Sequence, residues 1–441
     1  MAKITIIGAG SVVFAKRLIT DVLSFPELAD SVFSLTDIDA NRLQTAEKMV
    51  QTIIEANGNK ARVEASLDRK LALQDANYVL NLIQVGMHKA TVLDFEIPKK
   101  YGLKQTIADT LGVGGVFRAL RTIPVLLDIC REMEEVCPNA YLLNYTNPMA
   151  MLILAIQKAS SIKSVGLCHS VQNTTDDLAS YLSLPADELQ YKVAGINHMA
   201  WFLELKHNGK DLYPALFEAM NKAEIYNKDK VRFEMMRRLN YFVTESSEHM
   251  SEYTPYFIKR DHLINQFDIP IDEYIRRSEQ NLQRFAETKL KIEKGEPIYT
   301  EKSHEYGAPI IHSIETGTNR EIWGNVMNTN LITNLPTDAC VEVPCLVNKR
   351  GIQPIHVGDL PPQLAAMNRT NINVQQLTVE AALTGNIDYV YQAVMMDPHA
   401  SSVLSLDEIW NMTKELIRAH GDALPAFNKG RNLFSKEGVV L

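Results

Sequence analysis

The short N-terminal stretch KITIIGAGS, residues 3–11, decides the fold. Its β-branched run predicts a buried strand over residues 4–8, and a helical pattern follows at residues 14–23. Gly8 and Gly10 stand between them, where glycine allows a tight turn and a close approach of the backbone to a ligand. This strand–turn–helix order is typical of a loop that binds the pyrophosphate of a dinucleotide at a helix N-terminus.

The loop departs from the strict dinucleotide fingerprint at one position, because Val13 stands where a third glycine is usual. That glycine serves mainly helix–strand packing, so phosphate contacts of the loop and of Ser11 remain possible. An acidic residue at the end of the second strand would bind the ribose of NAD, and either Asp37 or its neighbour Asp39 could do so, with Asp37 preferred. Asp37 lies 27 residues after Gly10, more than the usual spacing of about 20, which predicts an extended first helix or loop.

The first half of the chain alternates buried strands with helical patterns. Further strands are predicted at residues 32–36, 78–83, 141–144 and 164–167, and further helices at 41–55, 115–136 and 148–158. This order predicts an α/β fold with an N-terminal, doubly wound parallel sheet of the Rossmann type, which we place at residues 1–195. Such sheets bind ligands at the carboxyl ends of their strands.

The pattern changes after residue 195. We expect a strand at residues 200–206, helices at 228–239 and 272–294, a strand-rich block over 310–347, and two closing helices at about 374–383 and 406–419. This predicts a C-terminal α+β domain over residues 196–441, for substrate binding and oligomerisation, with an architecture like that of lactate and malate dehydrogenases. A cleft is expected between the two domains.

Composition excludes several classes of protein. The 441 residues carry a net charge of −8 and no basic run, which argues against a nucleic-acid surface. No stretch reaches the roughly 18 to 20 apolar residues of a membrane span. Five cysteines without metal-ribbon spacing, and an N-terminus that begins as a strand, predict reduced thiols in a cytoplasmic protein.

Three short polar clusters lie at predicted strand ends: NYTNP at 144–148, VGLCHS at 165–170 and GINH at 195–198. In a doubly wound sheet they should converge beside the nicotinamide. Cys168 and His198 offer a thiolate and an imidazole, which suffice for a catalytic divalent ion if substrate oxygens or water complete its shell. The alternatives are a nucleophilic Cys–His dyad, or a buried inert thiol and a structural histidine.

These segments resemble motifs of the family 4 glycoside hydrolases, the NAD- and metal-dependent glycosidases. The similarity runs through nearly the whole chain. The most specific matches are NYTNPMA (144–150), CHSV (168–171) and GINHM (195–199). Three more resemble the α-galactosidase branch in particular, namely QTIADTLG (105–112), VTESSEH (243–249) and RTNINV (369–374).

The resemblance implies an oxidation–elimination route in place of two-carboxylate hydrolysis. NAD removes hydride from C3 of the sugar, a tyrosine base takes the acidified C2 proton while the metal stabilises the enediolate, and the aglycone leaves from C1. Water then adds and the hydride returns, so NAD is not consumed. The matching positions imply that Cys168 and His198 bind Mn²⁺ or another divalent metal, that His169 is the acid, and that Asn147 and Asn197 lie at the substrate.

Two assignments stay open. The base is Tyr253 or Tyr256, and Tyr253 fits the family position better. A tyrosine, with an ordinary pKa near ~10, needs a nearby cation to ionise at neutral pH. Asp109, in a glycine-rich segment, is expected to line the sugar pocket or to order the active-site loop, unless it is an ordinary turn carboxylate.

The substrate is expected to be an unphosphorylated α-galactoside such as melibiose. Relatives that cleave 6-phosphoglycosides place an arginine after the third strand, where this chain has Thr91, although nearby Lys89 could act as a point charge. A 6-phosphoglycoside, an α-glucoside and an α-galacturonide remain alternatives. A lactate/malate-type dehydrogenase and a non-catalytic NAD sensor are rivals of other classes. The resemblance suggests a homodimer or homotetramer.

Overall fold

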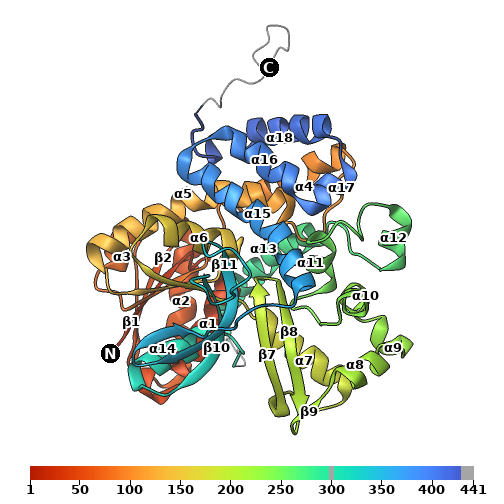
Figure 1. Ribbon diagram of the computed structural model, residues 1–441. Helices are drawn as coiled ribbons and strands as arrows, with labels where there is room; N and C mark the ends of the chain where they lie inside the picture. Colours follow the sequence, from red (N-terminus) through yellow and green to blue (C-terminus); the bar gives the residue numbers. More distant parts are fainter. Residues whose placement is uncertain (297–301, 429–441) are drawn as a thin grey trace.

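The computed structural model describes residues 1–296 and 302–428 (Figure 1). Its strands are β1 (Lys3–Ile7), β2 (Val32–Thr36), β3 (Arg62–Ala65), β4 (Tyr78–Asn81), β5 (Tyr141–Asn144), β6 (Lys163–Gly166), β7 (Leu189–Ile196), β8 (Met199–His207), β9 (Lys210–Asp211), β10 (Arg320–Met327), β11 (Cys340–Asn348) and β12 (Gly351–Pro354). They form one 12-stranded sheet in the order β3-β2-β1-β4-β5-β6-β10-β11-β7-β8-β9, with β12 paired to β11.

The helices of the first half are α1 (Val12–Leu23), α2 (Ala40–Asn57), α3 (Arg69–Leu73), α4 (Met87–Lys100), α5 (Gly112–Val136), α6 (Met149–Ala159), α7 (Ser170–Leu182), α8 (Tyr213–Ala219) and α9 (Ala223–Tyr226). Those of the second half are α10 (Lys230–Leu239), α11 (Ser247–Glu252), α12 (Asp261–Gln266), α13 (Glu273–Glu293), α14 (Gly307–Thr316), α15 (Pro362–Thr384), α16 (Ile387–Met396), α17 (Pro398–Val403) and α18 (Leu406–His420).

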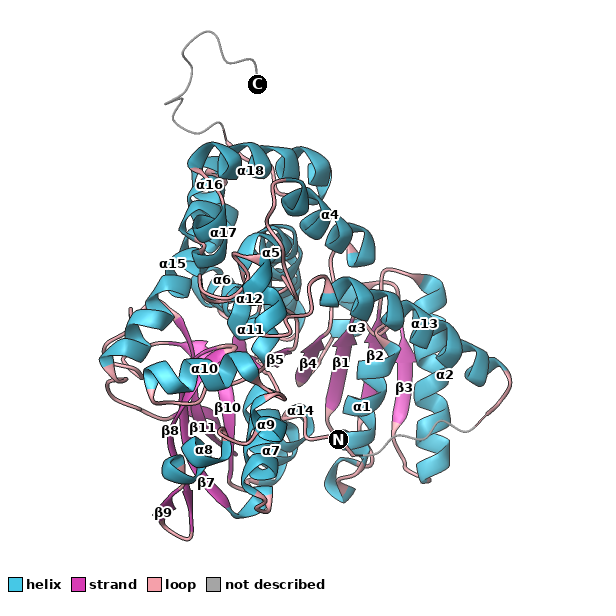
Figure 2. Ribbon diagram, turned by 90° about the vertical axis from the view of Figure 1, so that its right-hand side faces the viewer, coloured by secondary structure: helices cyan, strands magenta, loops and turns pink. Residues whose placement is uncertain are grey.

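The N-terminal half is the doubly wound parallel sheet that the sequence predicts. Strands β3, β2, β1, β4, β5 and β6 pair in parallel in that order, and Figure 2 shows β4, β1, β2 and β3 side by side. Their residues are mostly buried on both faces, as expected where helices cover a parallel sheet. The expected extra length before the second strand is also present, because a short 3₁₀ helix at Pro26–Leu28 follows α1.

Antiparallel strands continue the same sheet into the C-terminal half. β10 pairs with β6 and β11 pairs with β7, and β10 and β11 pair with each other. The sheet passes without a break through the predicted domain boundary, since residue 195 lies within β7. One row of residues crosses the four strands, from Gly166 through Asn325 and Glu342 to Gly195.

Two predictions for the second half were wrong. The expected strand-rich block begins with a helix, α14, rather than a strand. The apolar run of this segment reads as a strand by β-branched content, but its buried residues Ala308, Ile310 and Ile311 lie on a helix that packs against α1 and β11. The predicted closing helix at 374–383 is the last part of α15, and α16 and α17 follow it where no helix was expected.

Helices connect the two halves of the sequence. α5, α6 and α15 pack against one another, and α13, from the second half, lies against α1, α2 and α4. α18 packs on α4 and α16, at the end of the molecule that carries the C-terminal helices (Figure 1). Among the residues described, no helix has the length and apolar character needed to cross a membrane.

A buried ionic cluster joins α4, α5 and α18. Arg121 donates to both carboxylate oxygens of Asp94, at 3.1 and 2.5 Å. His420 Nε2 lies 2.9 Å from the same carboxylate. Arg121 and Asp94 are each only 2% exposed, so loss of one partner would leave an uncompensated charge in the interior.

We therefore expect Asp94→Asn to lower the free energy of unfolding by about 3 kcal/mol or more. The matched control is Asp128→Asn, because the Asp128–Arg131 pair is largely exposed and its loss should cost no more than about 0.5 kcal/mol. Urea titration followed by circular dichroism measures both. Equal midpoints for the two variants would contradict the importance of the buried cluster.

Candidate active site

A cavity of about 300 Å³ lies at the carboxyl ends of the parallel strands. It extends from Ser11, after the glycine turn, past Asn147 to Cys168 and His198. A second cavity of about 390 Å³ lies beside α10 and α11, but several of its charged groups pair with one another, as Arg232 does with Asp229. We place the candidate site in the first cavity, because it lies where doubly wound sheets bind ligands and six of the predicted site residues line it, namely Ser11, Asp109, Asn147, Cys168, His169 and His198. Tyr253 and Asn197 are not among its lining residues.

The glycine turn has the geometry of a ligand cradle. Gly8 adopts a φ of +79°, and a Cβ there would lie 2.9 Å from the carbonyl carbon of Leu82. α1 begins directly after Ser11, so the partial positive charge of its first turn faces the cavity mouth. Both observations fit a pyrophosphate that approaches the backbone closely.

The structure separates the two acidic candidates after β2. The carboxylate of Asp37 accepts a hydrogen bond from the Gly10 amide at 2.8 Å, so it lies at the glycine turn. Asp39 instead caps α2, accepting from the amides of Asn41 and Arg42 at 2.9 and 3.1 Å. Helix capping accounts for Asp39, and Asp37 remains the predicted ribose ligand.

Cys168 and His198 meet at the far end of the cavity, with Sγ and Nε2 3.3 Å apart. His198 occupies a two-residue turn between β7 and β8 at a φ of +62°, an uncommon conformation for a non-glycine residue. Burial lowers the pKa of His198 to about 3 and raises the pKa of the Cys168 thiol. The described residues contain no cluster of three or more potential metal ligands, so an ion here would take its other ligands from substrate or water.

His169 lies next to Cys168, one of the two predicted metal ligands, and contacts a residue that sequence reasoning missed. Its Nδ1 is 3.2 Å from a carboxylate oxygen of Glu305, which is buried. The hydrogen bond to Glu305 outweighs burial and raises the pKa of His169. Glu305 lies 136 residues away in the sequence, and no local pattern connects the two.

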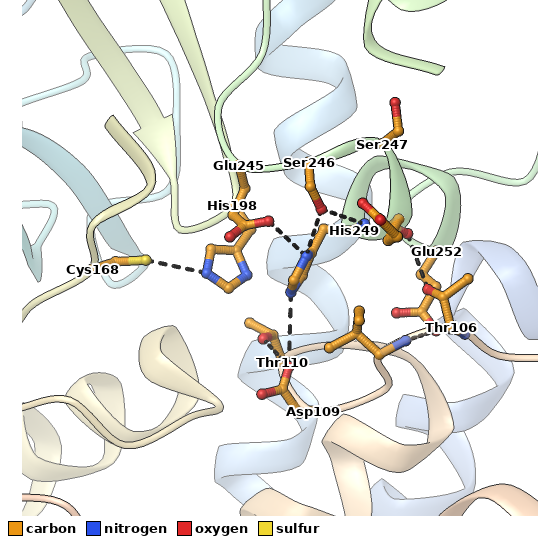
Figure 3. Close-up of polar contacts among 12 residues, drawn as sticks. Thr106, Asp109, Thr110, Cys168, His198, Glu245, Ser246, Ser247, His249 and Glu252 are labelled. Atoms are coloured by element: carbon orange, nitrogen blue, oxygen red, sulfur yellow. Dashed lines mark hydrogen bonds and ion pairs between the residues drawn. The ribbon is translucent and has the colours of Figure 1, made fainter. Parts of the chain in front are cut away.

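Asp109 is the centre of a polar network on the wall of the cavity (Figure 3). Its carboxylate accepts from Asn147 Nδ2 at 3.1 Å and lies 3.8 Å from His249 Nε2 and 3.9 Å from Arg118 Nη1. Burial opposes ionisation, but His249 and Arg118 outweigh it and hold the pKa of Asp109 well below its usual range. Asp109 therefore lines the pocket as an anion.

His249 lies between two carboxylates and beside His198, the second predicted metal ligand. Its Nδ1 is 2.8 Å from Glu245, opposite Asp109, and its ring meets the ring of His198 edge-on at 4.3 Å. Although burial opposes protonation, Glu245 and Asp109 raise the pKa of His249 to about 10. Glu245 and His249 belong to the word VTESSEH, but only the fold shows that they face the cavity.

The tyrosines differ sharply in their surroundings. Tyr253 is 1% exposed, its hydroxyl has no hydrogen-bond partner among the described residues, and its ring centroid lies 6.4 Å from that of His198. Tyr256 is 48% exposed. Tyr274, which sequence reasoning missed, lines the cavity and accepts a hydrogen bond from Arg118 at 2.8 Å. The side-chain amide of Asn197 is buried without a partner among the described residues, as expected of a group that awaits a ligand.

Comparison with known sequences finds one family over most of the chain. Residues 3–184 match the family described as "Family 4 glycosyl hydrolase", and residues 193–400 match its C-terminal domain. An α-galactosidase of Bacillus subtilis is 50% identical over 97% of this chain and 100% of its own length. An α-galactosidase of Rhizobium meliloti is 38% identical over 96% of this chain and 89% of its own length.

Solved structures share the fold. A Bacillus subtilis protein named as a candidate glucosidase has a TM-score of 0.86 at 25% identity, over 94% of this chain and 99% of its own. A 6-phospho-α-glucosidase from gut microorganisms, solved with NAD and Mn²⁺, has a TM-score of 0.82 at 20% identity, over 97% of this chain and 100% of its own. A malate dehydrogenase of Plasmodium falciparum has a TM-score of 0.53 at 14% identity, over 88% of this chain and 100% of its own. The expected relation to the malate dehydrogenase architecture is confirmed at the level of the fold.

The different roles of the two aspartates after β2 can be separated by mutation. Asp37→Ala should weaken NAD binding at least about tenfold, a loss of about 1.4 kcal/mol, without a comparable loss of stability. Asp39→Ala should leave NAD affinity unchanged and cost about 1 kcal/mol of stability, the usual value of an N-cap. Fluorescence titration with NAD and thermal unfolding give the two values. If Asp39→Ala alone weakened NAD binding, the assignment would be reversed.

Proposed function

The chain belongs to family 4 of the glycosyl hydrolases, and on that premise we propose that it hydrolyses α-galactosides such as melibiose. The observation that carries the proposal is the Cys168–His198 pair, 3.3 Å apart, at the end of a cavity that begins at the glycine turn. The α-galactosidase at 50% identity, matched over its whole length, supports the choice of sugar.

The site fits the two cofactors expected of this family. NAD bound at the glycine turn would supply a reversible hydride acceptor, and a divalent ion such as Mn²⁺ held by Cys168 and His198 would supply a Lewis acid. A Cβ at Gly8 would lie 2.9 Å from the Leu82 backbone, so only glycine keeps the tight turn that leads into α1. Nδ1 of His198 has no partner among the described residues, so no hydrogen bond there dictates which ring nitrogen carries the proton. Nε2, which faces the thiol of Cys168, can therefore be the unprotonated nitrogen that binds a cation. The relative solved with NAD and Mn²⁺ supports the same pair of cofactors.

The chain's own residues supply the proton transfers in this proposal. His169, oriented by Glu305, donates a proton to the oxygen of the departing aglycone. Tyr253, ionised to its phenolate by a neighbouring cation, takes the proton from C2 of the sugar and becomes a neutral hydroxyl again; its ring lies next to the imidazole of His198. Asn147 holds a sugar hydroxyl in the pocket that Asp109 also lines, and the unpartnered side-chain amide of Asn197 holds another from beside His198.

The surroundings of residue 91 favour an unphosphorylated sugar. The hydroxyl of Thr91 is committed to the carbonyl of Met87 within α4, and the residue is buried. Lys89 is exposed, and no lysine is among the described residues that line the cavity. Arg277 reaches the cavity but pairs with Glu273 at 2.9 Å. The family resemblance further leads us to propose a cytoplasmic homodimer or homotetramer.

Omission of single components tests the proposed reaction. The enzyme should release nitrophenol from 4-nitrophenyl α-galactoside only when NAD, Mn²⁺ and a thiol reductant are all present, and no NADH should accumulate. Hydrolysis that continues without NAD and metal would contradict the mechanism. Activity on the 6-phosphosugar alone would move the assignment to a phosphoglycosidase, and net NADH formation with a hydroxy acid would favour a dehydrogenase.

Replacement of the base gives a second test. Tyr253→Phe should lower kcat at least about 100-fold, the usual contribution of a general base, while NAD affinity and stability stay unchanged. Stability is preserved because the hydroxyl makes no hydrogen bond with the described residues. Tyr256→Phe is the matched control and should keep full activity, since Tyr256 is exposed. Full activity of Tyr253→Phe would exclude Tyr253, and the same variant of Tyr274 would then be examined.

A further inference from the structure

The segment at residues 105–110, which we call the strap, carries Asp109 and is held mostly by residues far away in the sequence. The carboxylate of Glu252, at the end of α11, accepts hydrogen bonds from three successive strap amides. The distances are 2.5 Å to Thr106, 3.1 Å to Ile107 and 3.0 Å to Ala108. Successive amides that converge on one carboxylate form an anion-binding nest.

This contact determines the conformation of the strap immediately before Asp109. Ala108 has a φ of +44°, a left-handed conformation that a non-glycine residue seldom adopts and that the surrounding contacts must hold in place. Glu252 is buried together with these amides. Burial raises the pKa of Glu252, and the hydrogen bonds from the Thr106 and Ala108 amides oppose that shift, so the same contact that holds the Ala108 conformation also stabilises the carboxylate. Removal of the carboxylate would release the backbone one residue before Asp109.

The other sides of the strap are in close contact with α5 and α13. A Cβ at Gly114 of α5 would lie 2.5 Å from the Ala108 carbonyl oxygen, and one at Gly115 would lie 2.8 Å from the Thr110 carbonyl carbon. The carbonyls of Gln105 and Thr106 accept from the amides of Asp272 and Tyr274 at the start of α13. The strap thus lies between α5, α11 and α13, and the carboxyl group that binds its backbone amides is that of Glu252.

α11 contacts both ends of this arrangement. His249 faces the Asp109 side chain while Glu252, three residues later, binds the backbone before it, as Figure 3 shows. One short helix therefore sets both the position and the charge environment of Asp109. Asp109 in turn holds Asn147 through the 3.1 Å hydrogen bond.

We propose that Glu252 is a positioning residue that fixes Asp109, and through it Asn147, in the sugar pocket. The inference rests on the proposed function, which makes that pocket the site where the sugar binds. Glu252 itself does not line the cavity, and it acts through the strap.

The test uses the full-length enzyme with NAD and Mn²⁺. Glu252→Gln keeps the shape of the side chain but turns an NH₂ group toward an amide donor, so kcat/KM for 4-nitrophenyl α-galactoside should fall at least about tenfold while NAD affinity stays within about twofold. The matched control is Glu248→Gln on the same helix. Its backbone carbonyl accepts from the Thr106 hydroxyl, and the substitution keeps that bond; its side chain makes no hydrogen bond with the strap among the described residues, so kcat/KM should change less than about twofold.

A double-mutant cycle separates positioning from a general structural role. If Glu252 acts through Asp109, Glu252→Gln should have no further effect on kcat/KM in an Asp109→Asn background. Multiplying losses in the double variant, or an unchanged Glu252→Gln enzyme, would overturn the proposal. If Glu252→Gln fails to fold, Gly114→Ala displaces the strap from its other side and should give the same loss; unchanged activity there would also overturn it.

Hydrogen–deuterium exchange keeps this test independent of the proposed function. Glu252→Gln should speed exchange in the peptide that contains residues 106–108, and Glu248→Gln should not. A wild-type enzyme inactive on every α-galactoside, with this exchange difference present, would reject the proposed function and leave the role of Glu252 in holding the strap intact. Unchanged exchange in Glu252→Gln would reject that role.

Discussion

The geometry of the site depends on the row of residues that crosses β6, β10, β11 and β7. Gly166 pairs with Asn325, Asn325 with Glu342, and Glu342 with Gly195. Cys168 lies two residues after Gly166, at one end of the row, and His198 lies three residues after Gly195, at the other end. The pairing of the four strands therefore sets how far along the sheet each of the two side chains lies. The glycines are needed for close packing, since a Cβ at Gly195 would lie 2.5 Å from the Met199 carbonyl oxygen.

Both halves of the sequence therefore place side chains in the same cavity, but different structural features position them. The N-terminal half places its groups by the parallel sheet, whose strands all end at the same edge. The C-terminal half adds α11 and the turn before β8, which bring His249 and His198 into edge-on contact. Charges alternate across the wall formed by Glu245, His249 and Asp109, so anionic groups stay ionised in a buried place where isolated charges would be costly.

Much of the fold could be predicted because the sequence repeats local signals. The β-branched run of β1, the mostly apolar run of β2 and the glycine turn gave correct positions, and strand-end clusters pointed to Cys168 and His198. The segment of α14 misled the prediction, since a short apolar run with several isoleucines does not distinguish a strand from a buried helix. The partners Glu305 and Glu252 could not be predicted, because each reaches its contact across more than 130 residues of sequence. The sequence favoured Asp37 over Asp39 but could not separate their roles, which the fold does through the Gly10 hydrogen bond to Asp37 and the capping of α2 by Asp39.

The central claim is that this cavity breaks a glycosidic bond by removing and returning the proton at C2 of the sugar. Hydrolysis of melibiose in D₂O tests it most directly, with the galactose analysed by nuclear magnetic resonance. Because the C2 proton passes to a side chain that exchanges with solvent, the account predicts galactose that carries deuterium at C2. Product galactose that retains ordinary hydrogen at C2 would contradict the account and indicate direct displacement at C1.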